Sequence, residues 1–189
     1  MRDDGGLLLH SCCGPCTLYP LEELRGEGFR LSGFFYNPNI HPYRELASRL
    51  ASYQRIAEEE GLETVIEGGY GLAPFLTAIN DFGESAYQPK SEERCGVCYR
   101  LRLEKTALAC REAGIKIFTT TLLVSPYQNH ELIKAMGERV AAEYGLTFLY
   151  RDFRPGFRHG MAKAKERGLY RQGYCGCIFS EYERYGGER

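Results

Sequence analysis

Seven of the eight cysteines in this sequence lie in three short groups. The groups are Cys12-Cys13-x-x-Cys16, Cys95-x-x-Cys98 and Cys175-x-Cys177, and each has a glycine within it or beside it. A single tetrahedral metal or iron–sulfur cube uses four thiolates, so seven clustered thiols exceed what one site needs. The pattern therefore predicts two thiol-bearing centres in one small protein, which is typical of electron transfer.

The vicinal pair Cys12-Cys13 and the pair Cys95-x-x-Cys98 are the expected ligands of an iron–sulfur cluster. Adjacent side chains diverge on regular secondary structure, but they can converge in a loop that contains glycine. Two such loops would supply the four thiolates of a 4Fe-4S cluster. The same four residues would also suit zinc, so iron and zinc remain alternatives on the residues alone.

The tail pair Cys175-x-Cys177 places two sulfurs one residue apart. This spacing suits a redox-active disulfide, or two ligands of a second mononuclear metal such as iron or zinc, better than two corners of the same cube. Cys16 could join the tail pair as a further ligand. Cys110 is different, because it falls at helical spacing with Leu103 and Ala107, which predicts a buried core thiol.

Structural disulfides are the competing explanation for so many cysteines, but they are expected in small secreted chains whose cores are weak. This chain has 189 residues, of which 43% are hydrophobic and 13% aromatic, enough for one good core. The apolar run Leu7–Leu9 is too short for a signal peptide, and no run approaches the roughly 18 residues needed to cross a bilayer. We therefore expect a cytoplasmic protein with reduced thiols and no membrane association.

The formal net charge is −1, so the whole molecule has no general attraction for nucleic acid. The stretch 151–171 differs from the rest, because it carries seven basic residues against two acidic ones. Its basic residues are Arg151, Arg154, Arg158, Lys163, Lys165, Arg167 and Arg171. Interleaved aromatic residues could stack unpaired bases while the cations bind phosphates. A solvated helix with a basic face is the alternative.

Strand-like and helix-like segments alternate along the whole chain. Strands are expected at 7–10, 31–36, 63–67, 117–124 and 147–151, and helices at 19–25, 42–60, 74–79, 95–113, 125–144 and 161–167. Ser125-Pro126-Tyr127-Gln128 reads as the capping box of the fifth of these helices. Parallel strands require crossover connections, so the alternation predicts an α/β fold: one Rossmann-like domain, 1–189, with a parallel sheet of about five strands.

Sites in such sheets form beyond the carboxyl ends of the strands, which is where the first cysteine group lies. Two further sets of candidates lie at the same edge. Asp152 and Arg154 follow the fifth strand as an acid or a substrate clamp, and Tyr36, Asn37 and Asn39 follow the second. His10 and His41 are either proton donors or structural groups. The segment from about 151 to 189 is expected to complete the site.

Six segments taken together resemble the QueH family of epoxyqueuosine reductases, over almost the entire chain. They are His10-Ser11-Cys12-Cys13-Gly14-Pro15-Cys16, Phe35-Tyr36-Asn37-Pro38-Asn39-Ile40-His41-Pro42, Arg94-Cys95-Gly96-Val97-Cys98-Tyr99, Thr119-Thr120-Thr121-Leu122-Leu123-Val124-Ser125-Pro126-Tyr127, Asp152-Phe153-Arg154 and Tyr174-Cys175-Gly176-Cys177. The resemblance implies a fold of the nucleotide-binding α-hydrolase type, in which the first cysteine loop replaces the phosphate loop of ATP pyrophosphatases.

The resemblance also implies reduction of epoxyqueuosine to queuosine at the wobble position of tRNA, without cobalamin. Cys12, Cys13, Cys95 and Cys98 would hold a 4Fe-4S cluster. Cys175 and Cys177 would act either as a redox-active disulfide or, with Cys16, as ligands of a second metal. Asp152 is then a catalytic candidate, and Arg154, Arg158, Tyr36 and Asn37 are candidates for substrate binding. The expected partners are the tRNA anticodon stem-loop and an electron donor such as a ferredoxin or flavodoxin.

Two alternatives belong to other classes. The first is a zinc-stabilised RNA-binding module without redox activity, which would use the same cysteines as structural ligands. The second is a tRNA sulfur-transfer enzyme on the same fold, which would need ATP. The missing phosphate loop counts against the second alternative.

Overall fold

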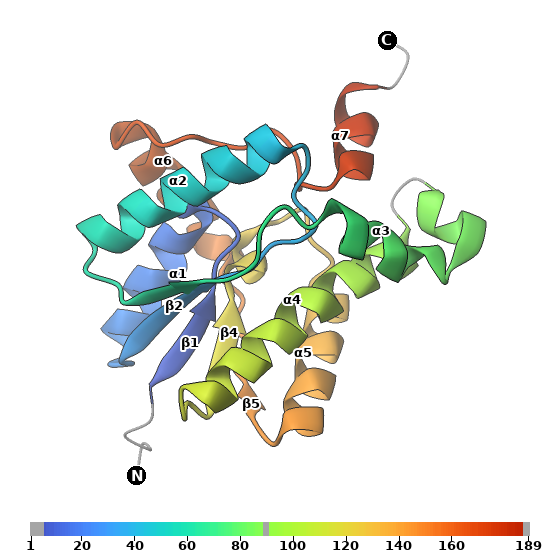
Figure 1. Cartoon of the computed structure of the whole chain (residues 1–189). Helices are drawn as coiled ribbons and strands as arrows, with labels where there is room; N and C mark the ends of the chain where they lie inside the picture. The colour runs from blue at the N-terminus through green and yellow to red at the C-terminus, as the bar shows by residue number, and fades with distance from the viewer. Residues whose placement is uncertain (1–5, 89–90, 187–189) are drawn as a thin grey trace.

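A five-stranded parallel sheet with the order β3-β2-β1-β4-β5 forms the centre of the computed structural model, which describes residues 6–88 and 91–186 (Figure 1). The strands are β1 (Leu7–His10), β2 (Leu31–Phe35), β3 (Thr64–Ile66), β4 (Ile117–Thr120) and β5 (Thr147–Phe148). In the register of the sheet, Leu7 pairs with Leu31 on one side and with Ile117 on the other. This topology confirms the predicted Rossmann-like α/β domain.

Helices cover both faces of the sheet. The helices α1 (Gly14–Gly26), α2 (Tyr43–Glu59) and α6 (Phe157–Glu166) pack together on one face, and α4 (Glu92–Glu112) and α5 (His130–Tyr144) pack together on the other (Figure 1). Two shorter helices, α3 (Leu72–Asn80) and α7 (Ile178–Tyr185), lie toward the upper right of the same view. Among the described residues, no helix has the length and apolar character that a membrane span requires.

The central strand β1 is buried along its whole length, as expected for a parallel strand covered on both faces. Its leucines pack with Phe34 of β2 and Phe118 of β4 in the main core. Cys110 of α4 is fully buried in the same core, which confirms its prediction as a core thiol. One cysteine of the eight is therefore structural, and the three groups remain for chemistry.

The strand order changes direction at β1, because the chain leaves β1 toward β2 on one side and later returns to β4 on the other. In open α/β sheets the crevice outside the carboxyl ends of two such strands is the usual binding site. Cys12 lies just after β1, and its backbone N–H donates to Thr121 Oγ1, just after β4, at 3.1 Å. The first cysteine group therefore lies in this crevice.

The fourth strand is shorter than predicted, because the segment 117–124 is not a strand throughout. The strand ends at Thr120, and Thr121–Val124 form a 3₁₀ helix, η2. Thr120 causes the change locally, since its Oγ1 accepts the backbone N–H of Leu122 at 3.2 Å. The residues here are β-branched and apolar because they are buried. Residue propensity alone cannot distinguish such a buried turn from a strand.

The predicted capping box at Ser125 is also wrong. Asn129 caps α5, because its Oδ1 accepts the backbone N–H of Leu132 at 3.0 Å, whereas Ser125 Oγ accepts from Tyr127 in a turn. Residues 125–129 therefore form a loop at the carboxyl edge of the sheet. This loop leaves Tyr127 and Gln128 beside the cysteines, where a helix was expected.

Other element boundaries also differ from the prediction. Helix α1 begins at Gly14, directly after Cys13, and α4 begins at Glu92, where Ser91 Oγ accepts the N–H of Arg94 at 3.1 Å. The strand β5 ends at Phe148, three residues early, and α7 was not predicted. The earlier start of α4 places Cys95 and Cys98 in the first two turns of the helix.

The close approach of α1 and α2 requires glycine at position 14, because an added methyl group would overlap the carbonyl oxygen of Ser52. Gly14→Ala is expected to lower the free energy of unfolding by about 1–3 kcal/mol, the usual cost of overpacking. Gly26→Ala on the same helix meets nothing within 4 Å and is expected to raise it by up to about 1 kcal/mol. Urea denaturation of both variants checks the pair. Equal midpoints would contradict the packing argument.

Candidate metal centre and active site

The first cysteine group forms a compact triad at the start of α1. The sulfurs of Cys12, Cys13 and Cys16 all lie within 4.8 Å of one another, and all three residues are buried. Cys13 is the N-cap of α1, and its Sγ accepts the backbone N–H of Cys16 at 3.4 Å. A helix N-terminus stabilises anionic sulfur, so this position favours thiolates and metal ligation.

The three thiols do not ionise independently. Hydrogen bonds from Cys13 and Cys16 lower the pKa of Cys12 well below its usual range. Burial raises the pKa of Cys13, and hydrogen bonding to Cys12 raises that of Cys16. Ionisation of one of these sulfurs therefore opposes ionisation of the other two. A bound cation would supply the charge that further deprotonation requires, which is the usual coupling between metal binding and thiol ionisation.

Gln172 covers the triad from the C-terminal segment. Its Nε2 donates to Cys13 Sγ at 3.0 Å and to Cys16 Sγ at 3.2 Å, whereas its Oε1 is buried and has no hydrogen-bond partner among the described residues. Gln172 was not among the predicted site residues, because a single glutamine in a loop belongs to no sequence motif. Its amide places a polar donor beside the sulfurs.

The second and third cysteine groups lie close to each other. Cys98 and Cys177 are buried in one apolar cluster with Phe75, Ile79 and Ala86. Burial, together with the neighbouring Cys175 and Cys177 sulfurs, raises the pKa of Cys95 to about 11. The structure therefore brings the tail thiols next to the pair that opens α4.

A buried arginine of α2 holds the tail in this place. Arg49 donates through Nη1 and Nη2 to the backbone oxygens of Cys175 and Tyr174, both at 2.9 Å, and through Nε to Glu45 at 2.6 Å. The carbonyl oxygen of Gly176 accepts the backbone N–H of His41 at 2.8 Å. These bonds fix the position of the Cys-Gly-Cys turn although it is about 125 residues from α2 in the sequence.

A cavity of about 600 Å³ opens beside the sulfurs. Its wall includes three thiols, those of Cys12, Cys16 and Cys175, together with the amides of Gln128 and Gln172. Leu122, Phe157 and Met161 supply apolar wall. Small-molecule sites typically measure roughly 300–1,000 Å³ and are mostly apolar with a few polar groups. The cavity therefore has the size and lining of a binding site, with sulfur exposed inside it.

The observed grouping of sulfurs differs from the grouping that the sequence analysis expected. The spacing predicts Cys95 and Cys98 with Cys12 and Cys13, and Cys16 with the tail pair. In the structure Cys16 is adjacent to Cys12 and Cys13, and the tail pair is adjacent to Cys95 and Cys98. All seven thiols nevertheless meet at one edge of the sheet. The division of ligands between two centres stays a prediction.

The donor set fits a metal–thiolate centre. Seven thiols lie at one edge, five of them at the caps or in the first two turns of α1, α4 and α7, and they adjoin two fully buried arginines, Arg49 and Arg102. Arg102 Nη2 donates to Cys98 Sγ at 3.1 Å. Buried cations require buried anions, and thiolate clusters are anionic.

Asp152 and Arg154, predicted beside the site, pair with each other. The Arg154 Nη2 to Asp152 Oδ2 distance is 2.7 Å, both side chains are exposed, and neither lines the cavity. Arg154 lowers the pKa of Asp152 to about 2, so at neutral pH this residue is a carboxylate and unsuited to donate a proton. The geometry thus gives no support to the predicted catalytic role of Asp152.

The candidates after β2, of which Asn37 and Asn39 are buried and Tyr36 is half-buried, hold the loop behind the triad. Asn37 Nδ2 donates to the carbonyl oxygen of Ser11 at 2.9 Å, and the carbonyl oxygen of Tyr36 accepts from His10 Nε2 at 3.1 Å. Burial lowers the pKa of His10 to about 4, so its ring is neutral at neutral pH. Neither Tyr36 nor Asn37 lines the cavity. Their placement favours a structural role over direct substrate contact.

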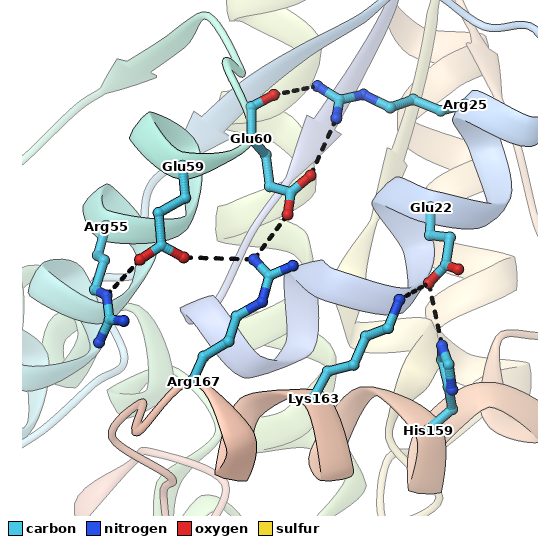
Figure 2. A network of polar contacts seen from close by, with 8 residues as sticks. All are labelled: Glu22, Arg25, Arg55, Glu59, Glu60, His159, Lys163 and Arg167. Atoms are coloured by element: carbon cyan, nitrogen blue, oxygen red, sulfur yellow. Dashed lines mark hydrogen bonds and ion pairs between the residues drawn. The ribbon is translucent and has the colours of Figure 1, made fainter.

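Several cations of the basic segment are paired with acidic residues of α1 and α2 (Figure 2). Lys163 meets Glu22 at 2.7 Å, and Arg167 meets Glu60 at 2.7 Å, so α6 is fastened to its neighbours by ion pairs. Arg151 pairs with Glu27 at 2.7 Å. Arg158 is exposed and forms no ion pair within the described part of the chain. The segment thus offers fewer free cations than its sequence implies.

Known proteins are similar to this chain over most of its length. The profile of a protein family described as "Epoxyqueuosine reductase QueH" matches residues 7–183. A protein of that name from Dehalococcoides mccartyi is 37% identical over 180 residues, which cover 95% of this chain and 94% of the relative. A second, from Thermotoga maritima, is 36% identical over 185 residues, covering 95% and 92%.

Proposed function

This chain belongs to the QueH family of epoxyqueuosine reductases, and we propose that it removes the epoxide oxygen of epoxyqueuosine in tRNA to give queuosine. The observation that carries the proposal is the meeting of the first and third cysteine groups at the wall of one cavity, with the second group packed against the third. Redox-capable sulfur is thereby placed where a small modified base could enter.

The reaction consumes two electrons and two protons and releases the oxygen as water. We assign Cys12, Cys13, Cys95 and Cys98 as ligands of a 4Fe-4S cluster, which supplies electrons one at a time when bound. This assignment leaves Cys16, Cys175 and Cys177. Cys16 and Cys175 line the cavity, which supports a role for the remaining thiols next to the substrate.

The tail thiols can take part in this reduction in either of two ways. Two thiols that close a disulfide release two electrons and two protons, which equals what opening the epoxide and losing water requires. Alternatively, Cys175 and Cys177 would bind a second metal ion together with Cys16, which would neutralise charge on the departing oxygen, and the external donor would then supply both electrons singly by way of the cluster. Both uses need both tail sulfurs.

The polar and apolar side chains that line the cavity have different roles in binding. Gln128 Nε2 donates to Cys175 Sγ at 3.1 Å, and its Oε1 accepts from Tyr99 at 2.6 Å, so this amide holds the tail sulfur at the cavity wall. The apolar side chains of Leu122, Phe157 and Met161 reduce the space open to water. A dry, oriented site strengthens electrostatic interactions with the substrate oxygen.

An exposed tyrosine at the mouth of the cavity suits the recognition of an unpaired base. Tyr127 is 85% exposed, lines the cavity, and meets Phe157 edge-to-face at 6.1 Å between ring centroids. Single-stranded RNA is bound largely by stacking of splayed bases on such rings. We assign Tyr127 as a stacking residue for the anticodon loop.

Tyr127→Ala is expected to raise KM for tRNA by about tenfold, because base stacking on a ring is worth about 1–3 kcal/mol, while kcat changes little. Tyr127→Phe, which keeps the ring, is expected to behave as the native chain. Steady-state kinetics on anticodon stem-loop RNA measures both. If Tyr127→Phe loses as much affinity as Tyr127→Ala, stacking is not the role of this residue.

Anaerobic purification separates the proposal from a zinc-stabilised RNA-binding module. The proposal predicts a brown protein with visible absorbance from sulfur-to-iron charge transfer, and iron with acid-labile sulfide on analysis. A colourless protein with stoichiometric zinc after expression in iron-replete medium would favour the module and refute the redox function.

A further inference from the structure

Three arginines of the described chain are almost completely buried, and one of them differs from the other two. Arg49 and Arg102 are 1% exposed and Arg94 is 2% exposed. Arg49 pairs with Glu45 at 2.6 Å, and Arg94 pairs with Glu183 at 2.7 Å. Within residues 6–88 and 91–186 no carboxylate forms an ion pair with Arg102. Its positive charge is therefore balanced by something other than an acidic side chain.

The partners of Arg102 are sulfur, carbonyl oxygen and an aromatic ring. It follows Cys98 by one helical turn on α4, and its Nη2 and Nε donate to Cys98 Sγ at 3.1 Å and to the Cys98 carbonyl oxygen at 3.0 Å. Its guanidinium lies 5.6 Å from the centroid of the Tyr99 ring. The sulfurs of Cys98, Cys175 and Cys12 are close enough to affect its electrostatics. Arg102 thus contacts the second cysteine group and lies within electrostatic range of the other two.

A guanidinium remains protonated in proteins, so Arg102 cannot avoid burial of its charge by losing a proton. A buried cation without an anionic partner is costly, because neutral hydrogen-bond acceptors replace only part of its hydration. The one described thiol in hydrogen-bond contact with Arg102 is that of Cys98, and a neutral thiol there would not supply that anion. Thiolates bound to metal would, since a cluster with four thiolate ligands carries net negative charge.

We propose that Arg102 is the fixed countercharge of the metal–thiolate centre and that it raises the reduction potential of that centre. This inference rests on the proposed function. When the centre accepts one electron from a one-electron donor, its net charge becomes one unit more negative and no atom is transferred. A fixed cation in hydrogen-bond contact with a ligand sulfur stabilises the reduced form more than the oxidised form.

Two variants separate charge from volume. Arg102→Met removes the charge and approximately keeps the volume, and Arg102→Lys keeps the charge. In a potentiometric titration with dithionite, Arg102→Met is expected to be reduced about tenfold less favourably, a negative shift of about 59 mV for one electron. Arg102→Lys is expected to lie near the native value. Equal potentials for the native chain and Arg102→Met would overturn the inference.

Urea denaturation of the iron-free chains provides a second readout that needs no activity. Without metal the charge of Arg102 is uncompensated, so Arg102→Met is expected to unfold at a higher urea concentration than the native iron-free chain. Arg94→Met is the matched control and is expected to unfold at a lower concentration, because it removes the partner of Glu183. Iron-free Arg102→Met that is less stable than the native chain would contradict the inference.

The outcomes are independent of those for the proposed function. Loss of iron in Arg102→Met but not in Arg102→Lys supports the role of Arg102 as the countercharge. If neither variant binds iron, the urea denaturation of the iron-free chains tests the inference instead. If the potential or stability differs between the native chain and Arg102→Met as expected, but the native chain leaves epoxyqueuosine unchanged, the proposed function alone is refuted.

Discussion

Cys98→Ala is expected to remove the visible iron–sulfur absorbance and to reduce turnover of epoxyqueuosine to background. Cys98 is buried, accepts a hydrogen bond from Arg102 and follows Cys95 by three residues on α4, so its sulfur is held in place before any metal binds. Iron and sulfide analysis with an anaerobic activity assay measures both losses.

Cys110→Ala is the matched control, because Cys110 is a buried cysteine of the same helix. It lies in the main core and is expected to lower stability modestly while iron content, absorbance and activity remain native. Native iron content in Cys98→Ala, or equal loss of iron in the two variants, would show that α4 does not supply the cluster ligands.

Cys175→Ala and Cys177→Ala are expected to keep the iron–sulfur absorbance and to lose activity almost completely. The proposed cluster ligands do not include these residues, whereas both roles proposed for the tail need both sulfurs. Iron per chain and single-turnover product formation are the measurements. Under the disulfide alternative, the oxidised native chain also shows a mass two hydrogens lower than its reduced form, and neither variant shows this loss.

The same variants test how the seven thiols are divided. If the cluster were held by Cys95, Cys98, Cys175 and Cys177, which adjoin in the structure, Cys175→Ala would lose iron together with Cys98→Ala. Loss of iron in Cys175→Ala but not in Cys12→Ala would therefore refute the assigned ligand set and replace it with that quartet.

The order of elements was predictable because periodicity and turn residues are local. The helix expected at 42–60 is observed as Tyr43–Glu59. Its apolar stripe and the glycine that follows it, Gly61, are both local signals that the sequence shows directly. The strand expected at 117–124 failed, because buried β-branched and apolar residues occur in a strand and in a buried 3₁₀ turn alike. The distinction depends on the Thr120 side chain and on tertiary burial.

The cysteine groups could be found from spacing, but their neighbours could not. Gln172 and Gln128 contact sulfurs that are 159 and 47 residues away, and Arg49 reaches Cys175 across 126 residues. Such partners carry no motif of their own. The same limit applies to the basic segment, because the sequence shows Lys163 without showing its ion-pair partner Glu22, which is 141 residues distant (Figure 2).

Conversion of epoxyqueuosine in tRNA is the measurement that tests the central claim most directly. The iron-loaded native chain, incubated anaerobically with reductant and tRNA that contains epoxyqueuosine, is expected to yield a nucleoside lighter by one oxygen and identical to queuosine by mass spectrometry. The Cys98→Ala chain is expected to leave the nucleoside unchanged. A fully iron-loaded native chain that leaves epoxyqueuosine intact with excess reductant would contradict the account.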